Sequence, residues 1–320
     1  MSKRVQGVRY NAGIKVKKKM PAGQIVGLVF LLLFVAILAW VILVGFYYPE
    51  YRQDKNVFDI GQTPQTEEIT VMSYNVRYFT PLDDLFEKSW FYRAGLVRQV
   101  VEKNAPDVIG FQEVGQFHTK YLKEHLARYS FTVAYRDNSL LKEGVMLAYR
   151  TDRFDLIKEG VFWLSDTPEK QSKNDDSQFC RIAGYLVLKE KATGREYTFF
   201  DTHLDNKGNN ARANQLNVIL EQAKTIAQGT VVLFGDMNDF EDSLMYENAT
   251  NALTDAMLIA DKVSVGTGAT YQRFGKELEH ERIDYFFVSE GTRVTEFTVD
   301  TTTFEGVYPS DHFPLIIKIK

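Results

Sequence analysis

Cysteine is almost absent from this sequence, since Cys180 is the single one in 320 residues. This excludes a disulfide-stapled scaffold and a cysteine-rich zinc site, but it leaves the redox compartment open, because many exported proteins also lack disulfides. The chain has no internal repeat and no low-complexity tract. Its hydrophobic share of 45% is that of a globular protein and excludes a disordered or fibrous one.

Negative charge is missing from the first 20 residues, and charge of either sign is missing from residues 21–49. The first segment carries seven lysines and arginines, while the whole chain has a net charge of −4, so the part from Glu50 onward carries −11. That part also has no runs of lysine or arginine. It therefore lacks the basic surface that a general electrostatic grip on duplex nucleic acid requires.

A long apolar run, VGLVFLLLFVAILAWVILVGFYY, extends from Val26 to Tyr48. A helix of about 20 such residues spans a bilayer. The alternatives are a buried core helix, which normally has a polar stripe, and a cleaved signal peptide, whose apolar region is shorter and ends in small residues. The aromatic cluster Phe46, Tyr47 and Tyr48 resembles an interfacial belt. We predict an uncleaved membrane anchor over 24–48, preceded by a basic cytoplasmic tail over 1–23.

The basic residues before this span outnumber Arg52 and Lys55 just after it. The positive-inside rule then predicts a cytoplasmic N-terminus and an extracytoplasmic C-terminal part, which is periplasmic if the source has two membranes. Residues 49–68 are polar without a clear period, and we predict a linker there. Since no proline- or glycine-rich boundary interrupts residues 69–320, we predict a single domain for them. No protein partner is identifiable.

Short apolar runs of strand type alternate irregularly with helical patterns in this domain. The runs are at 69–75, 107–112, 143–149, 181–188, 196–203, 230–235, 282–288 and 312–319, and the helical patterns are at about 89–103, 116–127 and 209–227. Many strands and few helices, without strict alternation, predict an α+β domain. Two sheets packed face to face with helices outside fit this pattern.

Polar side chains stand where these runs begin or end. The positions are Asn75, Glu113, His203, Asp236, Asn238, Asp284, Asp311 and His312. Each has an ordinary structural explanation: GDMN is a common turn, His203 can be a core histidine, and Asp284 can pair with Arg282. Six segments that share the feature point instead to one site, where loops from distant parts of the chain converge.

The residue types suit metal-assisted hydrolysis of a phosphoester. Glu113 can supply a carboxylate to Mg²⁺, and Asn75 can supply a carbonyl oxygen. Asp236 with Asn238 can orient or deprotonate a water, and imidazoles can stabilise the charge that develops on phosphorus. Asp284 or Asp311 can hold the tautomer of the last histidine.

The segments SYNVRYF, DVIGFQEV, FFDTHLDN, VLFGDMND, ERIDYFFVS and YPSDHFPL, in this order, resemble the endonuclease/exonuclease/phosphatase superfamily over about 69–320. The resemblance implies a four-layered α/β sandwich of two packed mixed sheets. It also implies Mg²⁺, or Mn²⁺, as cofactor. The implied metal ligands are Asn75, Glu113 and Asp311, and the implied catalytic residues are His203, Asp236, Asn238, Asp284 and His312.

A further stretch, VFWLSDTP, resembles a bacterial secreted or anchored branch in which an arginine follows, matched here by Arg181. This arginine can contact phosphate or form a structural salt bridge. Two positions depart from the family pattern. Arg77 stands where many nucleases of the superfamily have an aspartate, and the loop from Arg136 to Gly144 differs from that of the branch.

The sequence therefore predicts a membrane-anchored, exported, divalent-metal-dependent phosphoesterase. Its substrate is a small molecule, a lipid head group or nucleic acid, and the acidic balance favours the first two. The alternatives are an extracytoplasmic endonuclease or exonuclease acting on DNA or RNA, and a catalytically silent anchored binding module, which the arginine at position 77 motivates.

Overall fold

The structure is a computed structural model and describes residues 20–61, 67–80, 88–266, 268–276 and 282–320, with the backbone alone at 41–50, 52 and 53. The chain divides into two compact units, residues 1–49 and 50–320. Most of the basic tail lies outside the described residues. So do the side chains of the predicted aromatic belt, Phe46, Tyr47 and Tyr48.

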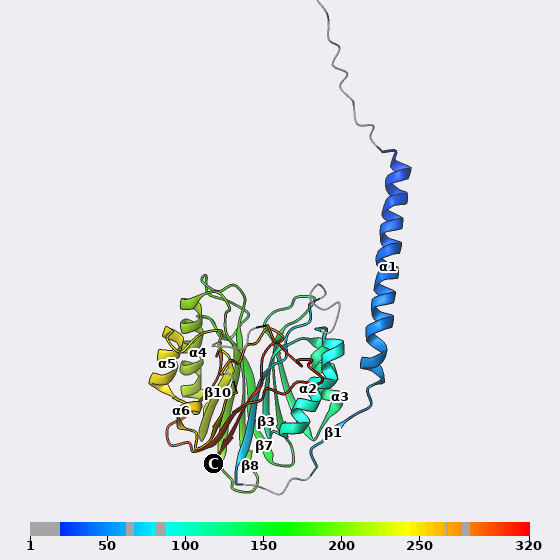
Figure 1. Cartoon of the computed structure of the whole chain (residues 1–320). Helices are drawn as coiled ribbons and strands as arrows, with labels where there is room; N and C mark the ends of the chain where they lie inside the picture. Colours follow the sequence, from blue (N-terminus) through cyan, green and yellow to red (C-terminus); the bar gives the residue numbers. More distant parts are fainter. Residues whose placement is uncertain (1–19, 62–66, 81–87, 267, 277–281) are drawn as a thin grey trace, which may run out of the picture. The chain divides into compact units, whose positions relative to one another are not determined.

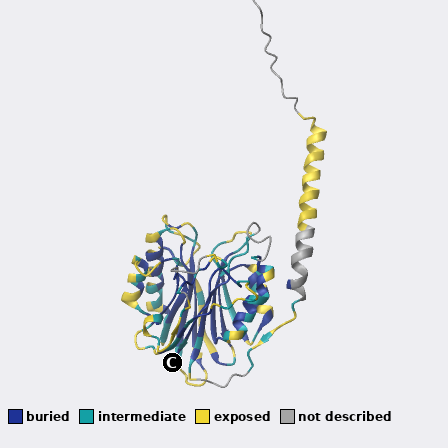
Figure 2. Cartoon of the chain, viewed as in Figure 1, coloured by how far each residue is buried: buried dark blue, intermediate teal, exposed yellow. Residues whose placement is uncertain are grey.

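Helix α1 covers Ala22–Gln53, and its residues 22–40 are exposed throughout (Figure 2). Within the described part of the chain, the segment Ala22–Trp40 is the one helical stretch long and apolar enough to cross a membrane. Length and composition of this kind suit a membrane span and a signal anchor alike. Anchoring therefore remains a proposal.

The larger unit contains two mixed β-sheets (Figure 1). The first sheet has six strands in the order β11 (Thr254–Asp255), β13 (Asp284–Val288), β10 (Thr230–Asp236), β9 (Glu196–His203), β8 (Ile182–Glu190) and β7 (Phe154–Trp163). The second has seven in the order β12 (Val263–Ser264), β14 (Val294–Val299), β15 (Leu315–Ile319), β2 (Ile69–Asn75), β3 (Val108–Val114), β6 (Gly144–Arg150) and β5 (Tyr129–Tyr135).

Helices lie on the outer sides of the strands, as Figure 1 shows. Helices α4 (Asn209–Ile226), α5 (Leu244–Ala252) and α6 (Ala256–Ile259) lie on one side, and α2 (Trp90–Asn104) and α3 (Gln116–His125) lie on the other. The predicted four-layered sandwich is confirmed. The three predicted helices are present, and all eight predicted strands are present with ends shifted by up to three residues.

Alternating side chains explain why the two sheets stack. In β10, Val232 and Phe234 belong to the core between the sheets, and Leu233 belongs to a second core beneath α4 and α5. A strand exposes successive side chains on opposite faces, so a run that is apolar on both faces is buried between two layers. Figure 2 shows the strands as the buried centre of this unit.

The expected linker over 49–68 begins as ordered structure. Helix α1 continues to Gln53, and the Tyr51 ring packs on Tyr121 and Phe91 at centroid distances of 5.0 and 5.1 Å. Strand β1 (Phe58–Asp59) then pairs with β4 (Leu126–Ala127). Residues 62–66 lie outside the described part. Aromatic packing and strand pairing therefore fix the start of this segment on the domain, although its sequence has no period.

Candidate active site

The register of three strands brings their polar ends together. Asp236 at the end of β10 is paired with His203 of the parallel strand β9 and with Asp284 of the antiparallel strand β13. In the other sheet, β2 and β3 run parallel; Asn75 ends β2 and is paired with Gln112, next to Glu113 near the end of β3. The two sheets therefore present their polar strand ends at one edge, as the sequence pattern predicted.

Asn75 connects the two sheets at this edge. Its amide nitrogen donates to Asp236 Oδ2 at 2.9 Å and to Glu113 Oε1 at 3.2 Å, and its amide oxygen accepts from the backbone nitrogen of Arg77. In this orientation the amide holds the half-buried carboxylate of Glu113 and the buried carboxylate of Asp236 close together. The role of Asn75 as a metal ligand through its oxygen stays a prediction.

His312 forms a charged pair with Asp284. Its Nδ1 lies 2.9 Å from Asp284 Oδ2, and its Nε2 lies 3.7 Å from Asp236 Oδ2. Burial lowers the pKa of His312, but the charges of Asp284 and Asp236 outweigh burial and raise the pKa to about 10. The ring is therefore a cation at neutral pH. Of the two candidate partners, Asp284 makes the contact, while Asp311 lies 3.5 Å from the guanidinium of Arg77.

His203 has the opposite protonation. Its Nε2 lies 3.5 Å from Asp236 Oδ2. Burial lowers the pKa of His203 well below its usual range, and the positive charges of Arg181 and Arg136 lower it further. Asp236 thus lies between a neutral and a charged imidazole. Burial and the charge of Asp284 raise the pKa of Asp236 to about 7, although the charge of His312 opposes that rise.

Strained backbone shapes this edge. Glu113 and Asn238 are in the left-handed region, with φ of 60° and 51°, which costs a non-glycine residue free energy and is found mostly at functional sites. The backbone nitrogen of Asn238 donates to Asp236 Oδ1 at 2.9 Å, and its side chain donates to Leu204 O at 3.0 Å. The turn therefore orients the Asp236 carboxylate.

Gly235 is required for the same turn. Its φ is 139°, and a Cβ atom there would lie 2.0 Å from Thr202 O of the neighbouring strand. No side chain fits at this distance. The glycine of the GDMN motif thus permits the close approach of β9 and β10 that brings His203 beside Asp236.

A pocket of about 480 Å³ opens at this edge. Seven of the nine predicted site residues line it: Glu113, Arg181, His203, Asp236, Asn238, Asp311 and His312. The other two, Asn75 and Asp284, lie directly behind it, hydrogen-bonded to residues that line it. The structure therefore brings all nine predicted residues to one place.

The donor set fits a hard divalent cation. Among the described residues, the carboxylates of Glu113 and Asp236 and a nitrogen of His203 form one group of potential ligands, with ligand atoms within 4.8 Å of one another. Oxygen-rich sites of this kind suit Mg²⁺ or Mn²⁺. A second group combines Asp236, Asp284 and His312, and within it Nδ1 of His312 lies 2.9 Å from Asp284 Oδ2. Asp311 belongs to neither group.

The sequence did not predict a role for three residues at the site. Arg136 and Glu143 line the pocket as an ion pair. Arg93 is fully buried and donates to the backbone oxygens of Val76, just after β2, and of Pro309, in the segment before β15 that carries His312. The sequence does contain a signal that Arg93 is buried, because it lies in the apolar stripe of α2, four residues before Val97.

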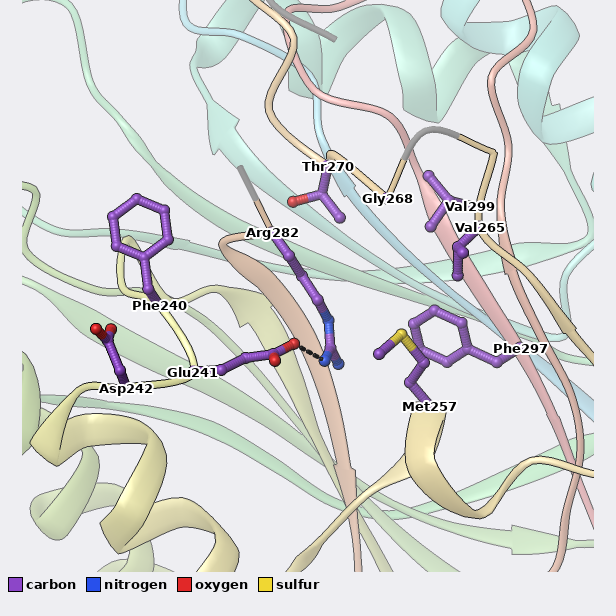
Figure 3. Close-up of a pocket in the computed structure, with 10 residues that line it drawn as sticks. All are labelled: Phe240, Glu241, Asp242, Met257, Val265, Gly268, Thr270, Arg282, Phe297 and Val299. Carbon is purple, nitrogen blue, oxygen red and sulfur yellow. Dashed lines mark hydrogen bonds and ion pairs between the residues drawn. The ribbon is translucent and has the colours of Figure 1, made fainter. Parts of the chain in front are cut away.

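Figure 3 shows another cavity, which has a volume of about 440 Å³. Phe240, Thr270 and Arg282 line it, one or two residues from chain positions that line the first pocket. Figure 3 shows Arg282 at the centre of this cavity, with a dashed line to Glu241. Arg282 Nη1 donates to Glu241 Oε1 at 2.6 Å. Arg282 also pairs with Asp255. Arg282 therefore pairs with these two acids and not with Asp284, which pairs with His312.

Comparisons with known proteins agree with this geometry. A sequence model of the Endonuclease/Exonuclease/phosphatase family matches residues 72–312. The mannosyl-6-phosphatase of Bacteroides thetaiotaomicron is 31% identical, with a TM-score of 0.73, over 79% of this chain and 99% of that chain. Another protein of this family from Bacteroides thetaiotaomicron is 30% identical, with a TM-score of 0.74, over 80% and 96% of the two chains.

A curated relative is an uncharacterized protein of Acanthamoeba polyphaga mimivirus, which is 26% identical over 71% of this chain and 91% of its own length. The family match covers the whole of the site described above, from Asn75 to His312. The chain belongs to the endonuclease/exonuclease/phosphatase family, whose members hydrolyse phosphoesters and generally depend on a divalent metal.

Proposed function

We propose that this chain is a divalent-metal-dependent phosphoesterase that uses water to cleave a small phosphoester. The observation that carries the proposal is the position of Asp236, whose Oδ2 lies 3.5 Å from the neutral His203 and 3.7 Å from the charged His312. A carboxylate with a pKa near neutrality can accept a proton from water, and an imidazolium can stabilise charge on phosphate. Both groups line one pocket.

Each group then has one task. Asp236, oriented by the backbone of Asn238, accepts a proton from the attacking water. His312, kept charged by Asp284, donates a hydrogen bond to a phosphoryl oxygen whose negative charge grows in the transition state. The neutral His203 donates from one ring nitrogen to a second phosphoryl oxygen.

Glu113 would hold the metal, with Asn75 and Asp311 as further predicted ligands. When bound, Mg²⁺ or Mn²⁺ supplies a Lewis acid that polarises a phosphoryl oxygen. The residues fit this purpose on charge, because the Asn75 amide brings the carboxylates of Glu113 and Asp236 together at the pocket. A cation would reduce the repulsion between these carboxylates, which contributes to the raised pKa of Asp236.

A small substrate is favoured over nucleic acid for two reasons. The part of the chain from Glu50 onward carries −11, which opposes binding to a phosphate backbone. A relative of 31% identity is named a mannosyl-6-phosphatase. We extend this substrate class, a phosphorylated small molecule, to the present chain.

We also propose that the apolar helix anchors the domain on the outer side of a membrane. The support is the uncharged run before Glu50 and the excess of basic residues ahead of it. Protease added to intact cells, or to spheroplasts of a source with an outer membrane, should degrade the domain and spare the tail. A domain protected until the membrane is lysed would contradict the orientation.

The experiment that tests the activity uses the full chain in detergent with Mg²⁺ or Mn²⁺. The substrates are DNA, RNA, a phospholipid head-group ester, inositol phosphates, a hexose phosphate and an aryl phosphodiester. His203→Ala and Asp236→Ala should abolish cleavage, and Asp261→Ala, an exposed aspartate paired with Arg293, should leave it unchanged. A wild-type chain that cleaves none of these substrates contradicts the proposal. Cleavage of DNA or RNA that falls steeply with salt would favour the nuclease alternative.

A further inference from the structure

An acid and an amide meet in the core between the two sheets. Asp201 lies on β9 of the first sheet and Gln112 lies on β3 of the second, and both side chains are fully buried. Gln112 Nε2 donates to Asp201 Oδ1 at 2.6 Å. Other residues of the same two strands, such as Phe199 and Val108, belong to the apolar core. This hydrogen bond therefore joins the two sheets through the core.

Burial of this pair costs free energy, so stability alone does not explain it. Asp201 Oδ2 and Gln112 Oε1 are buried, and neither atom has a hydrogen-bond partner among the described residues. Replacement of both partners of a buried polar pair by apolar groups of similar shape is often neutral or stabilising. Strand β3 also has a glycine beside the pair, since a Cβ at Gly110 would lie 2.7 Å from Cγ of Asp201. Gly110 thus makes room for the acid.

Gln112 belongs to a β-bulge that directs Glu113 toward the pocket. In the pairing of β3 with β6, the two residues Gln112 and Glu113 oppose the single residue Val145. Glu113 is in the left-handed region, with φ of 60°. A bulge of this kind changes the direction of a side chain and is common next to active sites. Glu113 accordingly lines the pocket, while the Gln112 side chain meets Asp201 in the core.

The other end of this link lies next to a second group of the site. Asp201 precedes His203 by two residues on β9, so both side chains are on the same face of the strand. The potential metal ligands come from both sheets, Glu113 from the second and His203 with Asp236 from the first. Their ligand atoms lie within 4.8 Å of one another, and this fit depends on how far apart the two sheets are held.

We propose that Asp201 is a positioning residue for the metal site. By holding Gln112, it fixes the bulge that directs Glu113, and it sets the distance between that carboxylate and the ligand atoms of the first sheet. The inference rests on the proposed function, because it assumes a divalent cation at this group of residues. Replacement of a group behind the ligands of a metal commonly lowers metal affinity about 10–100-fold.

Binding of Mn²⁺ to the metal-free full chain in detergent tests the link without any substrate. The electron paramagnetic resonance signal of free Mn²⁺ gives the dissociation constant. Asp201→Ala and Gln112→Met remove the same hydrogen bond from opposite sheets, and each should weaken Mn²⁺ binding about 10-fold. The double variant should also weaken it about 10-fold, and not about 100-fold, because both changes break one link. Asp201→Asn keeps an acceptor oxygen and should stay within about 3-fold of the wild type.

The matched control is Thr198→Val on the same strand. Thr198 is fully buried five residues before His203, and its Oγ1 donates to Gln228 O at 2.9 Å and accepts from Gln228 N at 2.8 Å. Valine has nearly the same shape but cannot make these hydrogen bonds. This variant should therefore lower the thermal midpoint and leave the affinity for Mn²⁺ unchanged.

The outcomes separate this proposal from the proposed function. If Asp201→Ala lowers the thermal midpoint but binds Mn²⁺ like the wild type, Asp201 is structural and the proposal is refuted, while the phosphoesterase stands. A double variant whose loss of affinity is the product of the two single losses would also refute it, because the two residues would then act separately.

If the wild type binds no Mn²⁺, the metal-dependent function fails, and hydrogen exchange at the backbone amides of residues 112–114 then judges the link. Faster exchange in Asp201→Ala and Gln112→Met, but not in Thr198→Val, supports the hold of Asp201 on the bulge. Equal exchange in all four proteins overturns it.

Discussion

Replacement of Arg93 by methionine should destabilise the domain and misplace the catalytic groups. Arg93 is fully buried on α2 and donates to four backbone oxygens, those of Lys88, Val76, Pro309 and Arg77, at 2.6, 2.9, 2.6 and 3.3 Å. Two of these carbonyls follow the strand that ends at the catalytic edge, and one precedes the segment that carries His312. A single side chain therefore joins a helix to two loops of the site.

The magnitude follows from the bonds that are lost. A hydrogen bond from a charged donor contributes about 1.5–3 kcal/mol, and each buried carbonyl left unpaired costs about 1–3 kcal/mol. The loss is partly offset, because methionine removes the desolvation penalty of a buried cation. We expect the free energy of unfolding to fall by about 3–5 kcal/mol. This is a large part of the stability of a domain, which is about 5–15 kcal/mol.

Urea denaturation of the full chain in detergent, followed by circular dichroism, measures this loss. The matched control is Arg293→Met, because the guanidinium of Arg293 is exposed and pairs with the exposed Asp261, so it should change stability by less than about 0.5 kcal/mol. At temperatures where Arg93→Met is still folded, we expect kcat to fall about 100-fold, since small displacements of catalytic groups are costly. A loss below about 1 kcal/mol with unchanged kcat would refute the reasoning.

Three further predictions concern buried groups near the site. Burial lowers the pKa of His118 to about 3, so the folded state resists its protonation and the free energy of unfolding falls as pH drops below about 6.5. Relative to His118→Gln, the wild type should lose about 2 kcal/mol between pH 6.5 and 5 in urea denaturation. Equal losses in the two proteins would contradict this. Burial raises the pKa of Asp201 well above its usual range, so Asp201→Asn should gain stability relative to the wild type as pH rises from 5 to 8. If the difference in thermal midpoint between the two proteins does not change with pH, Asp201 is ionised in the folded state. Gly235→Ala should lower the free energy of unfolding by about 3 kcal/mol or more and abolish activity, because the new Cβ would clash with Thr202 O. A variant with the wild-type urea denaturation curve and kcat would contradict the assigned geometry.

Local pattern was sufficient for the elements that are buried on both faces. The runs at 69–75 and 230–235 have apolar side chains at successive positions, and helix α2 repeats its apolar residues every three or four positions. Strands β5 and β7 had no such signal. They form the edges of the two sheets, and β7 has six exposed residues among ten, so its sequence does not show the pattern of a covered strand.

The sequence also determined which residues meet, because polar side chains at strand ends are carried to one edge by the strands themselves. The order of the motifs and the residue types were enough for this. Only the tertiary structure decided how they pair. The sequence offered both Asp284 and Asp311 as the partner of His312. The structure places Asp284 Oδ2 2.9 Å from the ring, whereas Asp311 lies beside the guanidinium of Arg77.

The ion pairing of Arg181 depended on packing in the same way. Sequence alone left it between a phosphate contact and a salt bridge. The structure shows that its neighbouring acid, Glu143, is held by Arg136 from across the β5–β6 turn. Whether a buried charge is satisfied depends on neighbours brought from distant parts of the chain. A strand or a helix follows from the local period of its own residues, whereas the pairing of charges is fixed only when the two sheets have packed.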